Sequence, residues 1–174
     1  MPVSCRITQP RMYAYLVAPT VFVMLLVGCG NAATTPPTPQ PTATATPVLG
    51  VAIPGPRAQF IQNLFVTDRV STDPQGNTPV TTLRIGAPVY IIFSVHGVPQ
   101  GEHHTITTYF FLQGQPKSKT NPLDVQDNFN GTASIVYPVA GIGMAKLYWD
   151  APTSDLSAPP SDDYLAQSIA FLIQ

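Results

Sequence analysis

Short apolar segments with a period of two run through the chain from about residue 58 to its end, separated by turn-forming residues. In the clearest of them, 89–95, every second residue is large and apolar: Val89, Ile91, Phe93 and Val95. Successive side chains of a β-strand point to opposite faces, so this alternation indicates a strand with one buried face. Helical periodicity is almost absent from the same region. The pattern predicts an all-β fold.

The segments and the turns between them define the expected order of strands. We predict strands at 60–70, 80–85, 89–95, 105–112, 123–129, 132–137, 144–149 and 164–173. The strand at 105–112 is apolar on both faces and is therefore expected to be central, and Asn130 with Gly131 suits a tight hairpin turn. Seven or eight short strands in a region of this length predict an immunoglobulin-like antiparallel β-sandwich, with an up-and-down barrel as the alternative.

The charge pattern excludes several functions. The net charge is −1 and charged residues make up 10% of the chain, with no Lys or Arg cluster outside the N-terminus, so a nucleic-acid partner is not expected. Glu102 is the sole glutamate, and no Gly-x-Ser-x-Gly motif is present. We therefore predict that the protein is not an enzyme and has no cofactor.

The N-terminus has the layout of an export signal, with Arg6 and Arg11 before an apolar segment at 12–27. The order Leu-Val-Gly-Cys at 26–29 resembles the end of a bacterial lipoprotein signal. That resemblance implies that the chain is cleaved before Cys29, that Cys29 carries a diacylglycerol, and that the protein is anchored on the extracytoplasmic face of the cell membrane. The alternative is that Cys29 is a small apolar residue at the end of an ordinary signal or of an uncleaved anchor.

A proline- and threonine-rich segment follows the cysteine. Residues 31–56 contain no charged side chain and too few large apolar residues to form a core, and proline favours an extended chain. The expected organisation is a lipoprotein signal peptide at 1–28, a lipidated cysteine with a disordered tether at 29–57, and the β-sandwich at 58–174. The tether is either a spacer that lifts the domain from the membrane or a linker without a length requirement.

The segments "GAPVYIIFSVHGVPQGEHHTITTYFFLQGQ" and "GIGMAKLYWD" resemble immunoglobulin-like domains at the ends of bacterial surface lipoproteins. The chain departs from antibody-type domains because it has no cysteine pair and its aromatic strand has no tryptophan. Ala145 stands where a tyrosine corner would be sought after "GIG". The resemblance therefore implies the fold and no functional residue.

Two groups of side chains are candidates for a metal site. Imidazole and carboxylate groups are zinc ligands, and His96, His103 and His104 lie near Glu102. Carboxylates can bind calcium, and one loop carries Asp150, Asp155, Asp162 and Asp163. Neither spacing matches a known metal motif, so the alternative for both groups is a solvated polar loop.

Aromatic residues flank the acidic loop and are candidates for contact with a sugar or a protein: Tyr148, Trp149 and Tyr164. The alternative for Trp149 is a place at the end of the core, where tryptophan is usually largely buried. Taken together, the sequence predicts a membrane-anchored domain that binds a protein or a glycan. The alternatives are a passive structural or accessory component of the envelope and a metal-binding lipoprotein.

Overall fold

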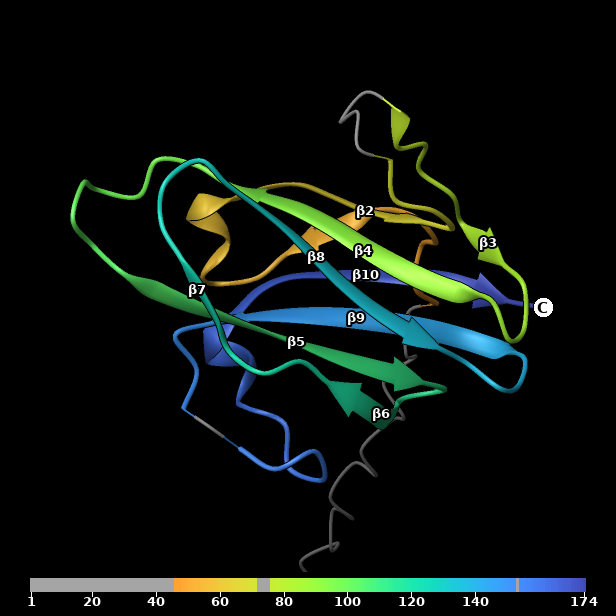
Figure 1. The fold of residues 1–174 in the computed structure, drawn as a ribbon. Helices are drawn as coiled ribbons and strands as arrows, with labels where there is room; N and C mark the ends of the chain where they lie inside the picture. Colours follow the sequence, from red (N-terminus) through yellow and green to blue (C-terminus); the bar gives the residue numbers. More distant parts are fainter. Residues whose placement is uncertain (1–45, 72–75, 153) are drawn as a thin grey trace, which may run out of the picture. The chain divides into compact units, whose positions relative to one another are not determined.

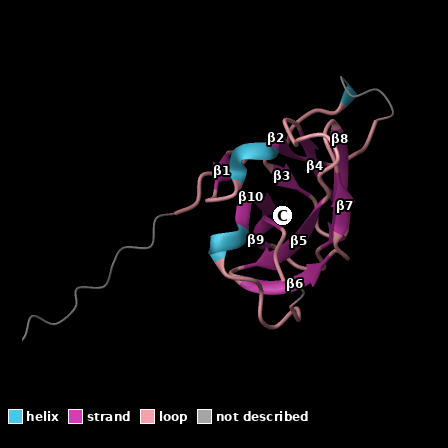
Figure 2. Ribbon diagram, turned by 90° about the vertical axis from the view of Figure 1, so that its left-hand side faces the viewer, coloured by secondary structure: helices cyan, strands magenta, loops and turns pink. Residues whose placement is uncertain are grey.

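The structure is a computed structural model that describes residues 46–71, 76–152 and 154–174 (Figure 1). The predicted signal peptide, Cys29 and most of the predicted tether lie outside the described residues. The described part is nearly all β-structure, and its helical turns are short (Figure 2). None of the helices in these ranges is long and apolar enough to cross a membrane.

Ten strands occur in the described residues and form two antiparallel-dominated sheets. The larger sheet has the order β1-β10-β9-β5-β6, with β3 on β10 and β7 on β5. Its strands are β1 (Ala52–Pro54), β3 (Thr82–Leu83), β5 (His104–Leu112), β6 (Gln115–Lys119), β7 (Leu123–Val125), β9 (Gly141–Trp149) and β10 (Leu165–Ile173). The smaller sheet is β2-β4-β8, with β2 (Ile61–Thr67), β4 (Pro88–Val95) and β8 (Phe129–Val136). Two short 3₁₀ helices, η1 (Ala58–Phe60) and η3 (Asp162–Tyr164), precede β2 and β10.

The order of these strands confirms the predicted immunoglobulin-like sandwich. The alternative, an up-and-down barrel, is not formed. The orders β2-β4-β8 and β10-β9-β5 match the A-B-E and G-F-C groups of the immunoglobulin fold. The short β3 follows β2 in the chain but pairs in parallel with β10 of the other sheet. Two strands were not predicted: β1, whose three residues are too few to show alternation, and β6, whose five residues are mostly polar and show no apolar row.

The strand pairing corrects two predictions, the start of the sandwich and the position of a turn. The sandwich was expected to begin at residue 58, but β1 pairs with β10, so residues assigned to the tether belong to the sheet. Asn130 and Gly131 were expected in a tight turn, but they lie within β8. Gly131 is needed for space, since a Cβ there would lie 2.1 Å from Cζ of Phe93. The preceding turn instead uses Asn128, whose φ is 58°.

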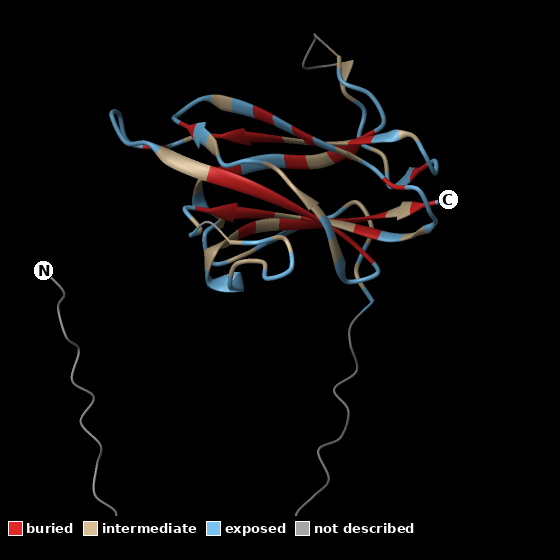
Figure 3. Cartoon of the chain, turned by 60° about the horizontal axis from the view of Figure 1, so that its bottom comes forward, coloured by how far each residue is buried: buried red, intermediate tan, exposed pale blue. Residues whose placement is uncertain are grey.

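The core lies between the two sheets, where the buried residues are concentrated on the strands (Figure 3). The alternation predicted in β4 is confirmed, since all four of its large apolar residues are buried there. Strand β5 lies between β9 and β6, and seven consecutive residues of it are buried, as expected of a central strand. A second, smaller cluster lies on its other face: Tyr109, Phe111 and Tyr148.

A buried tyrosine joins the sheets at the corner after β8. The hydroxyl of Tyr137 donates a hydrogen bond to the backbone oxygen of Phe111 in β5, at 3.0 Å. Burial raises the pKa of Tyr137 far above its ordinary value. The contact differs from an antibody-type tyrosine corner, whose hydroxyl bonds to the backbone a few residues upstream, because it spans 26 residues and reaches a strand of the larger sheet.

Candidate functional site

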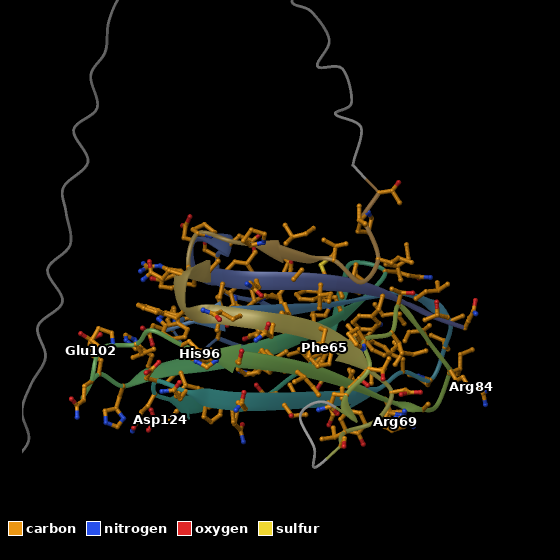
Figure 4. The ribbon with its side chains drawn as sticks, turned by 90° about the horizontal axis from the view of Figure 1, so that it is seen from above. Phe65, Arg69, Arg84, His96, Glu102 and Asp124 are labelled. Carbon is orange, nitrogen blue, oxygen red and sulfur yellow. The ribbon has the colours of Figure 1, made fainter. Side chains whose placement is uncertain are left out.

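The three histidines lie at one end of the sandwich, together with residues of the β7–β8 connection. Figure 4 shows His96, Glu102 and Asp124 at this end, and Arg69 and Arg84 at the other. Nδ1 of His96 lies 3.0 Å from Oδ1 of Asn128. His103 is exposed, with its Nδ1 3.6 Å from Oδ2 of Asp124. The histidines thus have separate partners and do not converge.

His104 is held more firmly than the other two. Its Nδ1 lies 2.6 Å from Oδ2 of Asp150, and its Nε2 lies 3.3 Å from Oε2 of Glu102. Its ring packs against those of Trp149 and Phe60, at centroid distances of 4.8 and 6.1 Å. The imidazole therefore connects the β4–β5 loop to the end of β9.

The pairing of β5 with β9 explains why Asp150 reaches this histidine. Ile106 lies opposite Trp149, the last residue of β9, so the residue that follows the strand meets the start of β5. The backbone N–H of Asp150 donates to the oxygen of Thr105, and its Oδ1 accepts from the N–H of Thr105 at 2.8 Å. Asp150 has a φ of 47°, a conformation that Asp tolerates better than most residues.

The pKa of His104 follows from opposing effects. Burial lowers it, but the hydrogen bonds to Asp150 and Glu102 and the negative charges of these groups raise it by more in total. The net pKa of His104 is therefore above the ordinary value of 6.5. Its protonated form suits the site, because both ring nitrogens then donate to a carboxylate.

The other acidic candidates also have separate contacts. Asp162 accepts from Nζ of Lys146 at 2.9 Å and from the hydroxyl of Tyr148 at 3.3 Å. Asp163 accepts from the hydroxyl of Ser161, which caps η3, and Asp155 is exposed. Within the described ranges, no group of three or more His, Cys, Asp or Glu residues has an arrangement that could hold a metal ion.

The aromatic candidates contact the protein itself. Trp149 is buried in the main core and Tyr148 in the smaller cluster, where Tyr164 packs against it. The ring of Tyr109 lies edge-on to that of Tyr148, and the Tyr109 hydroxyl donates to the backbone oxygen of Ser154. Burial, followed by the charge of Asp162, raises the pKa of Tyr148. These contacts fasten the loop between β9 and β10 over the outer face of the larger sheet.

A groove that the sequence did not reveal lies on the outer face of the smaller sheet. It has a volume of about 340 Å³, and none of the described residues that line it is charged. Phe65 of β2 and Ile92 of β4 supply its apolar surface, and Figure 4 looks onto this face with Phe65 labelled. Amides and hydroxyls supply its polar surface: Asn63, Ser71, Asn77, Ser94, Asn130 and Thr132.

A bulge in β2 shapes the groove. The register between β2 and β4 shifts between Gln62 and Phe65, and Asn63 has a φ of 51°. Bulges redirect side chains near functional sites. Here the Asn63 amide donates to Oγ of Ser94 at 3.1 Å, and Ser94 in turn donates to the oxygen of Gln62. This chain of hydrogen bonds fixes the amide and hydroxyl on the floor of the groove.

The exposed strand β8 supplies the other wall of the groove. Asn130 and Thr132 are exposed there, and neither side chain has a hydrogen-bond partner among the described residues. These two side chains, with the fixed Asn63, offer donors and acceptors to a ligand. The arrangement can bind a neutral, polar molecule that has one apolar face, and none of the described lining residues is a carboxylic acid, a histidine, a lysine or an arginine.

Comparison with known proteins does not identify a family for this chain. No family model matches the chain, and no curated protein matches it. Two structures of superoxide reductase (neelaredoxin) from Ignicoccus hospitalis, the second with one substitution, are similar over part of the chain. They show 14% and 16% identity and TM-scores of 0.35 and 0.34, and the matches cover 55% and 56% of this chain and 76% and 77% of theirs. At these values the activity of those proteins does not transfer to this chain.

Proposed function

We propose that this protein is an exported, lipid-anchored binding module whose β-sandwich binds a neutral glycan in the groove on the β2-β4-β8 sheet. The observation that carries the proposal is the lining of the groove, where the described residues place amides and hydroxyls around the ring of Phe65 and none of them is charged. A binding role, and not catalysis, agrees with this lining.

The chemistry of a neutral sugar fits this lining. A sugar ring presents C–H groups on its faces and hydroxyls around its edge. The C–H face can pack on an aromatic ring such as Phe65, and the hydroxyls can pair with Asn63, Asn130 and Thr132. Ligand pockets commonly measure roughly 300–1,000 Å³, so a groove of about 340 Å³ suits one or two sugar units.

The test uses the full chain in detergent and a panel of immobilised neutral and acidic oligosaccharides. We expect binding to neutral members, and a loss of about tenfold or more in affinity for Phe65→Ala, because tenfold corresponds to about 1.4 kcal/mol and an aromatic contact is of that order. Val139→Ala, a truncation of another exposed apolar residue, is the matched control and should bind as the wild type does. Equal binding by Phe65→Ala, or a preference for acidic glycans, would contradict the proposal.

The anchor has its own test. If Cys29 carries the lipid, the full chain should fractionate with membranes, and Cys29→Ser should remain unprocessed or leave the membrane fraction. The expected lipid provides more than a single weakly binding acyl chain, which alone gives only marginal attachment. Normal processing and membrane retention of Cys29→Ser would show that the anchor is wrong. If no glycan binds while the anchor holds, the role of a passive envelope component is favoured instead.

A further inference from the structure

Strand β8 forms an open edge of the smaller sheet. It is eight residues long and, among the described residues, pairs with β4 alone. In an antiparallel pair every second residue directs its N–H and C=O away from the partner strand. Half of the backbone groups of β8 therefore point outward, where another strand can pair with them.

The other sheet edges in the described part are protected or very short, since β3 has two residues and β7 has three. Strand β6 carries Pro116, Lys117 and Lys119, and proline and lysine both discourage strand addition. Strand β1 has three residues and ends in Pro54. The free side of β2 is occupied in part, because Val80 and Gln167 donate hydrogen bonds to it.

None of these protections is present in β8. Its sequence, FNGTASIV, contains no charged residue and no proline, and its pairing with β4 runs through all eight residues without a bulge. In the immunoglobulin fold, strand D can pair with the equivalent of β8. Here the corresponding chain segment contains β7, which pairs with β5 of the larger sheet.

We propose that β8 pairs with β8 of a second copy of this chain, antiparallel and about a two-fold axis through Thr132. The pairing joins two three-stranded sheets into one continuous sheet. In an antiparallel pair, residues directly opposite each other point to the same face of the sheet. Two copies related by a two-fold axis meet this condition when the axis passes through a residue, and not when it passes between two residues.

The side chains of β8 favour Thr132 as the centre. In this register Thr132 faces its own copy, and Asn130 faces Ser134, so the outer row consists of polar, uncharged pairs. On the inner face Phe129 lies opposite Ile135, twice. Both are only partly buried in one chain, and aromatic pairs with β-branched residues stabilise adjacent strands. An axis through Ala133 would instead pair Asn130 with the apolar Val136 within the strands, whereas the axis through Thr132 leaves Val136 opposite Asn128, outside β8.

A second copy is the occupant that the charge pattern fits. Two copies of β8 can pair without charge repulsion, because the strand has no charged residue. The edge strand β6 differs, since its lysines would favour an acidic partner. With one unprotected edge in the described residues, pairing also ends at two copies and does not extend to a fibre. A strand pair alone gives a small interface, so the dimer should be weak and favoured by a shared membrane.

Cysteine crosslinking of the full chain in membranes tests the register. The domain contains no cysteine, since the two in the chain are Cys5 and Cys29, and the wild type measures their background. We expect a crosslinked dimer from Thr132→Cys on oxidation or with a short bismaleimide. Ser157→Cys, in an exposed loop, should stay at background.

Two further variants complete the register test. Asn130→Cys and Ser134→Cys should crosslink when produced together and not when produced singly. A dimer from Asn130→Cys alone as strong as that from Thr132→Cys would overturn the register. No crosslink above background from Thr132→Cys would overturn the pairing.

The apparent mass in detergent provides a second measurement. The wild-type chain should move from one copy to two as its concentration rises, and Thr132→Lys should remain a monomer because two ammonium groups would lie opposite each other. Ser157→Lys, which adds the same charge in the loop, should dimerise as the wild type does. A monomeric wild type throughout, or a dimeric Thr132→Lys, would contradict the proposal. Neither measurement uses a glycan, so both outcomes are independent of the proposed glycan site, and the mass measurement in detergent is independent of the proposed anchor as well.

Discussion

Replacing His104 by glutamine should reduce stability by an amount that depends on pH. The side chain of His104 is 19% exposed, whereas those of Asp150 and Glu102 are 45% and 54% exposed. A hydrogen bond to a charged group contributes about 1.5–3 kcal/mol, and an exposed ion pair about 0–1 kcal/mol. Because both carboxylates face solvent, we expect His104→Gln to lower the free energy of unfolding by about 1–2 kcal/mol when the imidazole is protonated.

The direction of the pH effect follows from the raised pKa of His104. A folded-state pKa above the unfolded value means that the stabilisation is fully present below the unfolded pKa and is lost as the pH rises through the folded pKa. Above it the neutral ring donates only one hydrogen bond, and its second nitrogen faces a carboxylate. The difference between wild type and His104→Gln should therefore shrink as the pH rises beyond 6.5.

Urea unfolding from about pH 5 to about pH 9 measures this difference. His103→Gln is the matched control, since His103 is the neighbouring residue but its side chain is 59% exposed, and its substitution should change stability little at any pH. A loss that is constant across the range for His104→Gln would refute the ionic role and leave only packing against Trp149. A loss that grows with rising pH would show that the pKa is lowered and not raised.

Two substitutions test the core. Gly131→Ala places a Cβ within 2.1 Å of the buried Phe93 ring and should cost about 1–3 kcal/mol or more, seen as a lower thermal midpoint; an unchanged midpoint would mean that the ring moves freely. Tyr137→Phe removes the hydrogen bond to Phe111 and should cost about 1–3 kcal/mol in denaturant unfolding, whereas a stability equal to the wild type would indicate that the acceptor finds another donor.

The alternation in the sequence was sufficient to predict the all-β class and the central place of β5. Strands β4 and β5 each bury a recognisable row of side chains, and such rows depend on nearby residues alone. Strand β1 was missed because its three residues are stabilised by pairing with β10, more than a hundred residues later. The role of Gly131 was missed for the same reason, since the space it leaves is needed by a ring on another strand.

The candidate sites were harder to predict than the fold. His104 and Asp150 were placed in separate groups, because only the register of β5 with β9 brings them together. The groove around Phe65 depends on a bulge in β2 and on three strands that are distant in sequence. Its residues are individually ordinary, and an uncharged site offers no motif to find. Asparagine tolerates the positive φ that Asn63 has in the folded chain, but the presence of an asparagine does not predict that conformation.

The proposed pairing and the proposed glycan site have a joint consequence. A two-fold axis perpendicular to the sheet keeps the outer faces of both copies on the same side, so both grooves would open in one direction. Asn130 and Thr132 line the groove and also lie on β8, so the two grooves would meet near the axis. A linear oligosaccharide should then bind more tightly than its monosaccharide, and this gain should increase with the density of the chain in vesicles, because only a dimer presents two grooves. If the gain in affinity does not depend on density, both sugar contacts lie within one chain, and the glycan site does not require the dimer.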